Sequence, residues 1–247
     1  MLVNPLALNN DLPWSLAQRG LTKYNHVFVS QVWGGFELSF LKLLFGKKET
    51  RRAQINPDVI WFSRQAKYDG IRAHLQRDSL LQCAAILLVA HSKDTLEQLQ
   101  QIAEAYDGDI PVMSLMAGDL SSDVANRLQI GEDKVIELVI AERHPLTYID
   151  DHVIDGFAEL LACRCNATCY LSLDDELVRE FGGDRAKEIM SKMGMKDDET
   201  IESKMVSRRI RASQKKLTKL AEQTNSKQHV EDRIREGDWE SAFKDLL

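Results

Sequence analysis

The chain has 247 residues, of which 44% are hydrophobic and 28% are charged, and its formal net charge is -6. This length suffices for one large domain or two small ones. The acidic balance argues against a nucleic-acid partner bound to a globally basic face. Four cysteines in a chain this long do not make a disulfide scaffold, so we expect a reducing, cytoplasmic compartment. No apolar run approaches the roughly 20 residues that span a bilayer, and the N-terminus lacks the pattern of a secretory signal.

Short apolar runs rich in valine, isoleucine and leucine recur over the first two thirds of the chain. Most of them lack strict alternation of apolar and polar residues, which is typical of strands covered on both faces. The predicted strands are residues 26–33, 58–63, 84–92, 109–117, 134–141 and 168–173.

The clearest helical pattern follows the predicted strand 84–92. Ser92 is a candidate N-cap, and Asp94 lies in the first turn, where the helix dipole favours a carboxylate. Gly108 is placed to end the helix, and the next apolar run follows at once. A strand, a helix and a second strand in this order predict a parallel α/β sheet.

The strands are predicted to stop near Leu173, where the pattern changes to helices with charged faces. We therefore predict an α/β domain over residues 1–173 and a helical extension over residues 174–247. The change falls in the stretch "LSLDDEL", in which three acidic residues, Asp174 to Glu176, directly follow a predicted strand.

An acidic group after a strand has two interpretations. It can hold magnesium, as in a P-loop NTPase, but that site needs a G-x-x-x-x-G-K-[ST] loop, and this sequence contains none. It can instead begin a helix. We favour the second interpretation, in which Asp174 caps the helix while Leu177, Val178 and Phe181 turn inward.

The segment 170–217 resembles the SecA preprotein translocase ATPase family. The resemblance rests on four motifs in the family's order: Tyr170 to Leu177, Phe181 to Arg185, Met193-Gly194-Met195, and Met205 to Lys216. In the family these motifs end the second motor domain and begin the helical scaffold. The run "AERHPLTYIDD" at 141–151 is similar to the family's T-E-R-H-E-S-R-R-I-D-N.

The resemblance weakens where the family carries an arginine-glycine run whose arginines act on nucleotide phosphates. Here that stretch is residues 152–167, with Ile154, Gly156 and Glu159 near the expected arginine positions. A phosphate clamp needs planar, permanently charged guanidinium groups, and Glu159 would repel phosphate. Arg143 is the candidate that remains if nucleotide binds.

The resemblance implies a degenerate RecA-like (P-loop NTPase-like) parallel-sheet fold with an α-helical C-terminal extension. It favours a non-catalytic SecA-like pseudo-motor without a cofactor. Such a protein would bind a partner in protein export, either the translocation machinery or a full-length SecA, in the cytoplasm or peripherally at the membrane. The alternative is a protein that binds ATP or ADP, alone or by completing an ATPase site on a partner chain.

Residues 36–54 are weakly similar to the amphipathic N-terminal element of the same family. Its apolar and basic residues could contact anionic lipid or a partner; an ordinary core helix followed by a basic turn is the alternative. The candidate contact residues are Phe36, Phe40, Lys47, Lys48, Arg51 and Arg52.

Cys163, Cys165 and Cys169 form a C-x-C-x-x-x-C pattern, which could bind zinc together with His144 or His152. The alternative is that these cysteines are small core residues of a strand.

Residues 203–220 contain seven basic residues and no acidic ones. The basic face could bind an acidic partner or phosphate, through Arg208, Arg209, Lys215 and Lys216. Alternatively, it could be neutralised by the preceding segment 174–202, which has ten acidic and five basic residues. We favour internal neutralisation.

Overall fold

A computed structural model describes residues 53–77, 80, 82–128, 130–196, 198–202 and 204–247. Residues 51–247 form one compact unit by their internal contacts. The predicted strand 26–33 and nearly all of the predicted amphipathic segment 36–54 lie outside the described residues. The candidate contact residues Phe36, Phe40, Lys47, Lys48, Arg51 and Arg52 therefore remain predictions.

The described strands form one seven-stranded sheet. Its strands are β1 (Ala53–Ile55), β2 (Val59–Trp61), β3 (Cys83–Ala90), β4 (Val112–Met116), β5 (Val135–Ile140), β6 (Arg164–Ser172) and β7 (Thr200–Glu202). The order across the sheet is β4-β3-β5-β6-β2-β7, with β1 also paired to β6. All described pairs are parallel except β2 with β7. The predicted α/β parallel sheet is thus confirmed.

The central strands are buried on both faces, which explains their continuous apolar sequences. Leu87 and Val89 of β3 pack into one core cluster, whereas Ile86 and Leu88 pack into another. Because successive side chains of a strand point to opposite faces, one strand contributes to two cores. Each core needs its own layer of helices.

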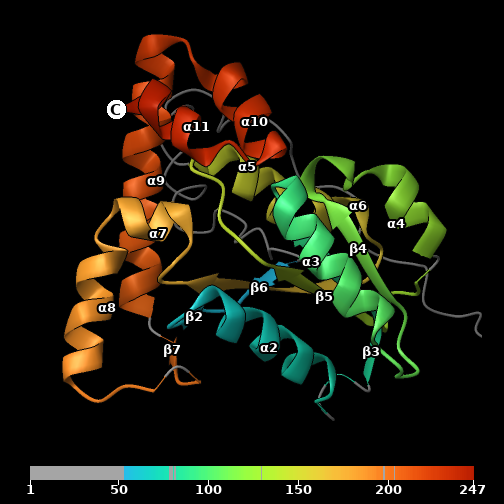
Figure 1. Ribbon diagram of the computed structural model, residues 1–247. Helices are drawn as coiled ribbons and strands as arrows, with labels where there is room; N and C mark the ends of the chain where they lie inside the picture. Colours follow the sequence, from blue (N-terminus) through green and yellow to red (C-terminus); the bar gives the residue numbers. More distant parts are fainter. Residues whose placement is uncertain (1–52, 78–79, 81, 129, 197, 203) are drawn as a thin grey trace, which may run out of the picture. The chain divides into compact units, whose positions relative to one another are not determined.

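Helices cover the two faces separately (Figure 1). One face carries α2 (Arg64–Leu75) and α3 (Lys93–Glu104), which bury Ile71 and Leu99 in the cluster that contains Ile86. The other face carries α4 (Ser122–Leu128), α6 (Phe157–Leu160) and the π-helical turn η3 (His152–Gly156). Val124 and Phe157 pack there against Leu87. The short η2 (Ala117–Asp119) joins β4 to α4.

The C-terminal part packs as helices against the end of the sheet. Its elements are α7 (Glu176–Glu180), α8 (Gly183–Lys192), α9 (Lys204–Thr224), α10 (Lys227–Glu236) and α11 (Trp239–Leu246). Leu217 of α9, Val230 of α10 and Trp239 of α11 share a third core with Leu146, which precedes α5 (Thr147–Asp151). The terminal helix therefore docks on this body.

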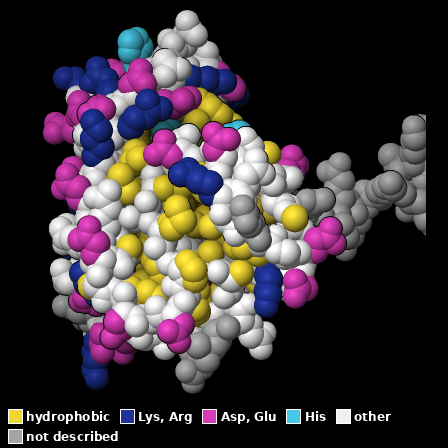
Figure 2. Space-filling model, turned by 90° about the vertical axis from the view of Figure 1, so that its right-hand side faces the viewer, with side chains coloured by type: hydrophobic (Ala, Val, Ile, Leu, Met, Phe, Trp, Pro, Cys, Tyr) yellow, Lys and Arg dark blue, Asp and Glu magenta, His cyan; other side chains and the backbone are white. Residues whose placement is uncertain are grey.

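Strand β4 is an edge of the sheet, and Figure 2 shows the side on which β4 and α4 lie. Hydrophobic side chains gather in the middle of this face, with charged side chains around them. Met113 of β4 is among the exposed hydrophobic residues, with 38% of its surface accessible.

Two expectations about the strands were wrong. Strand β7 lies beyond residue 173, where the sequence predicts helices only. It has just three residues, Thr-Ile-Glu, and it is stabilised by antiparallel pairing with the edge of β2 that β6 leaves open. Strand β6 begins at Arg164 rather than at 168, because its first residues pair with β5.

Candidate functional site

The carboxyl ends of β3, β5 and β6 meet at one edge of the sheet, where open α/β folds usually bind ligands. Three polar segments directly follow these strands: His91-Ser92, Glu142 to His144, and Asp174 to Glu176. The structure brings the first two segments into one buried cluster of polar side chains. The third lies beside them on the α2 side.

Glu142 occupies the N-terminus of α3. Its Oε1 accepts hydrogen bonds from the backbone N–H groups of His91 and Ser92, both at 2.7 Å. The hydroxyl of Ser92 also donates to Oε1 at 2.9 Å, and the hydroxyl of Thr95 donates to Oε2 at 2.8 Å. A helix N-terminus at this edge is where an α/β protein commonly binds phosphate. Here a side chain of the chain itself fills it.

Ser92 holds the N-cap position of α3 as predicted, but its side chain makes no capping hydrogen bond. Its hydroxyl is directed to Glu142 instead. A carboxylate from the next strand therefore satisfies the first donors of the helix, and its charge also suits the positive end of the helix dipole.

Asp150 of α5 is the centre of a second buried group, called here the Asp150 hub. Its side chain is 2% exposed and accepts from the Arg143 guanidinium at 3.0 Å and from the His144 N–H at 3.1 Å. The Gln214 amide of α9 donates to it at 2.7 Å. Nε2 of His91 lies 3.1 Å from its Oδ1. Burial raises the pKa of Asp150, but Arg143 and these donors outweigh that effect and hold it well below its usual range.

Arg143 binds two carboxylates at once. One of its terminal nitrogens donates to Asp58 at 2.6 Å and the other to Asp150 at 3.0 Å. The side chain is 9% exposed. Burial alone would lower the pKa of Arg143, but its anionic surroundings raise it well above its usual value. This guanidinium is therefore paired inside the protein, and its proposed role in binding nucleotide remains a prediction.

His144 is buried as a neutral ring. Its Nδ1 accepts a hydrogen bond from the backbone N–H of Leu146 at 3.1 Å, and its ring lies edge-on to His91, with centroids 5.2 Å apart. Burial lowers the pKa of His144 to about 3, and the neighbouring His91 adds to this effect. The ring thus acts as a structural acceptor rather than as a proton carrier near neutral pH.

The acidic residues Asp174 to Glu176 have structural roles, as predicted, but the helix cap is one residue later than the sequence analysis placed it. Asp175, not Asp174, holds the N-cap position of α7. Its carboxylate accepts from the buried Lys67 ammonium at 2.8 Å and from the Ser172 N–H at 2.9 Å. Asp174 instead accepts from Lys187 at 2.7 Å. The predicted inward position of Phe181 was also wrong, since this ring is 44% exposed.

The predicted zinc ligands are not brought together. Among the described residues no group of three or more histidine, cysteine or acidic side chains could hold a metal ion. Cys165 and Cys169 lie along β6, and Cys163 directly precedes it. A strand rises about 3.3 Å per residue, which separates Cys165 from Cys169 by about 13 Å. All three are buried in a core cluster that does not include His152. Burial raises the pKa of Cys165 to about 12.

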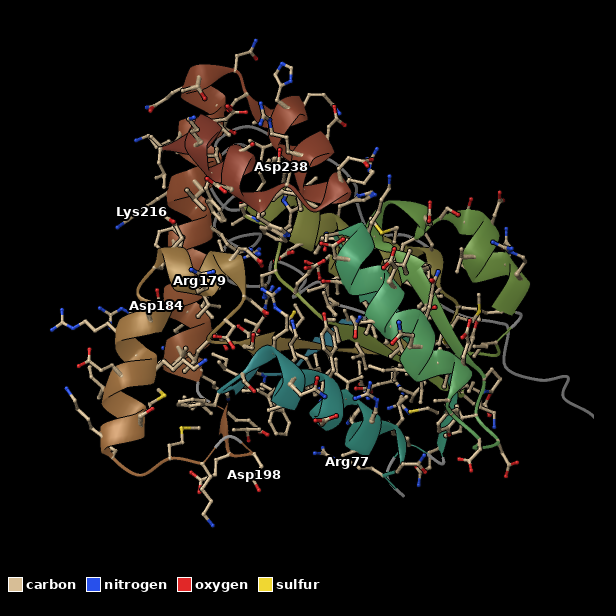
Figure 3. All side chains as sticks on the ribbon, viewed as in Figure 1. Arg77, Arg179, Asp184, Asp198, Lys216 and Asp238 are labelled. Carbon is tan, nitrogen blue, oxygen red and sulfur yellow. The ribbon has the colours of Figure 1, made fainter. Side chains whose placement is uncertain are left out.

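The basic helix predicted at 203–220 is α9, and its outer face is cationic. Arg208, Arg209, Lys215 and Lys216 are exposed, and Lys216 points away from the body in Figure 3. No ion pair among the described residues joins these four to an acidic group, and the α9 cation that is paired, Arg211, contacts Asp151. Five acidic side chains of 174–202 form ion pairs among the described residues, and their partners lie within that segment or on α2. Internal neutralisation, which we favoured, does not occur through ion pairs of the described residues.

Sequence reasoning missed most of the hub. Gln214 is fully buried in a helix interpreted as solvent-exposed and basic. Outside the hub, the buried Lys67 of α2, which is 1% exposed and binds Asp175, was also missed. The signal that could have indicated the hub is the polar run that follows β5 directly, because such a run at a strand end is positioned at the edge of the sheet.

No helix of the described residues is long and apolar enough to cross a membrane.

Comparisons with known proteins find similar sequences. The family model for the SecA P-loop domain matches residues 97–198. The protein translocase subunit SecA of Desulfovibrio desulfuricans (strain ATCC 27774 / DSM 6949 / MB) is 29% identical over 188 residues, which cover 65% of this chain and 21% of that protein. The protein of the same name from Helicobacter pylori (strain Shi470) is 34% identical over 133 residues, covering 53% of this chain and 15% of that protein. The chain thus spans about a fifth or less of the length of these relatives.

Replacing Arg143 by alanine should destabilise the protein strongly. The change leaves Asp58 and Asp150 buried without their cation, and breaking a buried pair in this way costs about 3–5 kcal/mol. Urea unfolding followed by circular dichroism measures the effect. Arg235→Ala is the control, because Arg235 is exposed on α10 and its loss should change the unfolding free energy by less than about 0.5 kcal/mol. Equal stability of the two variants would contradict the hub.

Stability should fall as the solution is acidified, in part through His144. The folded protein holds its pKa at about 3 while the unfolded chain has the ordinary value of 6.5. Between these values the unfolded chain binds a proton that the native protein does not, so acid favours unfolding by about 1.4 kcal/mol per pH unit for this group.

His144→Asn keeps an acceptor for the Leu146 N–H and removes the titration. The dependence of its unfolding free energy on pH should be shallower than that of the parent between about pH 6 and pH 4. Parallel curves for the two proteins would show that His144 is not buried in its neutral form.

Proposed function

We propose that this chain, a divergent SecA-like protein, is a non-catalytic pseudo-motor that serves as a binding or regulatory partner in protein export or at the membrane surface. The relatives are protein translocase subunits by name. The proposal gives this chain a role in the same process, through protein contacts and without nucleotide hydrolysis.

The main observation behind the proposal is that the protein's own side chains occupy the edge of the sheet at which a ligand would bind. Glu142 occupies the N-terminus of α3 with four donors around it. Arg143, the arginine nearest to this edge in sequence, is paired with both Asp58 and Asp150. A nucleotide phosphate would have to displace a buried carboxylate from one position and break two buried ion pairs at the other, and each step is costly.

The stretch that resembles the family's arginine run supports the same proposal. Ile154 is buried in η3, and Gly156 of the same turn has the His152 ring against it. Glu159 is exposed on α6. These residues lie on the sheet face that carries α4, and they offer packing rather than cationic donors. The arginine of this stretch, Arg164, is exposed at the start of β6, and the three positions that resemble the family's arginines carry no cation, which supports a non-catalytic role.

The cationic face of α9 supports a role in binding. Unpaired exposed cations on one helix repel each other and gain most when an acidic partner approaches. Met205 and Ala212 are the apolar residues on that face, and the apolar side of α9 is used inside the protein. The face therefore suits an acidic protein surface, and its charge could also attract an anionic membrane from outside.

A tagged pull-down from detergent-solubilised membranes and from cytosol tests the proposal, with the bound proteins identified by mass spectrometry. The parent chain should recover the translocation machinery or a full-length SecA. A variant with Arg208, Arg209, Lys215 and Lys216 changed to glutamine should lose most of that recovery, since complementary charge raises the association rate.

The matched control changes four exposed cations elsewhere to glutamine: Arg127, Lys192, Arg235 and Lys244. It removes the same net charge and should retain the partner. Recovery of neither translocation component from either fraction would contradict the proposed function, and the resemblance would then record ancestry alone.

A further inference from the structure

An apolar groove lies between α8 and the first half of α9. It has a volume of about 640 Å³, and its floor includes Ile60 of β2, Leu173 and Ile201. This volume falls within the range of about 300–1,000 Å³ that is typical of binding pockets. Figure 1 shows α7, α8 and α9 grouped at the β2–β7 end of the sheet, away from α3, α4 and α6.

Helix α8 presents an apolar stripe to this groove without covering it. Ala186, Ile189 and Met190 share one face of α8 and line the groove, yet Gly183 is the one buried residue of that helix. Ile189 is 49% exposed, and Phe181, just before the helix, also lines the groove and is largely exposed. Exposing apolar side chains to water costs free energy. Several such side chains next to one another on a surface therefore indicate an interaction site.

The charged residues that line the groove have one sign. They are Arg185 of α8 and Arg209 of α9, and no acidic residue lines it. Neither arginine has an ion-pair partner among the described residues. The acidic residues of α8 are engaged elsewhere, because Asp184 pairs with Arg179 and Glu188 pairs with Lys192. The rim thus offers unpaired cations beside an apolar floor.

This combination fits an amphipathic helix better than it fits a small molecule or a membrane. A small-molecule site has several convergent polar groups that fix the ligand, whereas this groove is lined almost wholly by apolar side chains. A membrane surface is broad and cannot enter a recess between two helices. A helix can place apolar side chains at i, i+3, i+4 and i+7 into such a groove while its flanks meet the rim charges.

We propose that the groove between α8 and α9 binds an amphipathic helix of a partner protein, with apolar side chains on the floor and carboxylates at Arg185 and Arg209. This inference rests on the proposed function, in that it assigns to the binding protein one place where a partner docks. The groove shares Arg209 with the outer face of α9, but Arg185 and Ile189 belong to α8, and changing them leaves that face intact.

A labelled model peptide tests the groove directly. The probe is a helical peptide of about 18 residues, long enough to be helical, with leucines at i, i+3, i+4 and i+7 and glutamates on both flanks. Binding to the full chain is followed by fluorescence anisotropy. We expect saturable binding that weakens at least about tenfold in Ile189→Glu and in Arg185→Glu, as for residues central to an interface.

Matched controls separate the groove from general charge effects. Met193→Glu adds the same charge at an exposed site at the end of α8 that does not line the groove, and Arg235→Glu reverses a charge on α10. Both should bind the peptide as the parent does. Thermal unfolding of each variant checks that it is folded, which we expect because Ile189 and Arg185 are exposed.

Other occupants give different results. No saturable binding by the parent, or equal binding of a peptide with lysines in place of glutamates, overturns the inference. Binding to vesicles of phosphatidylcholine and phosphatidylglycerol that is lost in Ile189→Glu would make the occupant lipid. A dimer in sedimentation that dissociates in Ile189→Glu would make it a second copy, and either result also overturns the inference.

The two proposals can fail separately. If the peptide does not bind but the pull-down still recovers a translocation component, the groove assignment fails and the proposed function stands. If the peptide binds as expected but neither component is recovered, the groove is a docking site and the link to protein export fails.

Discussion

The carboxylate of Asp150 is ionised in a place that almost no water reaches, so the protein itself must supply the groups that stabilise its charge. The carboxylate receives the Arg143 guanidinium, the backbone of His144 and the amide of Gln214. Two of these donors come from the loop between β5 and α5, and the third comes from α9. A buried charge of this kind is tolerated only when its partners are in place together, so the hub couples the position of α9 to the edge of the sheet.

On the proposed account, the same arrangement leaves no free phosphate site at this edge of the sheet. At this edge the helix N-terminus and the arginine are both present, but each already has an internal partner. Glu142 satisfies the first donors of α3, and Asp58 with Asp150 neutralises Arg143. The polar groups that would bind a ligand instead hold strands and helices together. On the proposed account, surfaces for partners lie elsewhere, on the outer face of α9 and in the groove beside α8.

The central strands could be predicted from the sequence because the apolar residues that form each of them are consecutive in the chain. The runs at 84–92 and 134–141 are rich in valine, isoleucine and leucine without strict alternation, so burial on both faces can be predicted from the residues alone. Strands β1 and β7 have three residues each and depend on partners about 110 and 140 residues away, in pairs such as Ala53 with Cys165 and Ile60 with Ile201. No local pattern reports such pairing.

For the side chains, the sequence predicted which type of residue is needed at a position but not which individual residue takes the role. An acidic residue at the start of α7 was expected, but the choice between Asp174 and Asp175 depends on Lys67, which lies on α2. Phe181 was expected to be buried because its spacing is helical, yet no described element covers it, and it borders the groove instead. Gln214 was hidden inside a strongly basic helix, because its burial comes from contact with α5 rather than from its neighbours in sequence.

The measurement that tests the central claim most directly is calorimetric titration of the full chain with magnesium ADP and magnesium ATP. The account predicts no saturable heat with either nucleotide, because the positions for phosphate are filled by Glu142 and by the carboxylate partners of Arg143. Stoichiometric, saturable binding of either nucleotide would contradict it, and the edge of the sheet would then have to open to admit phosphate.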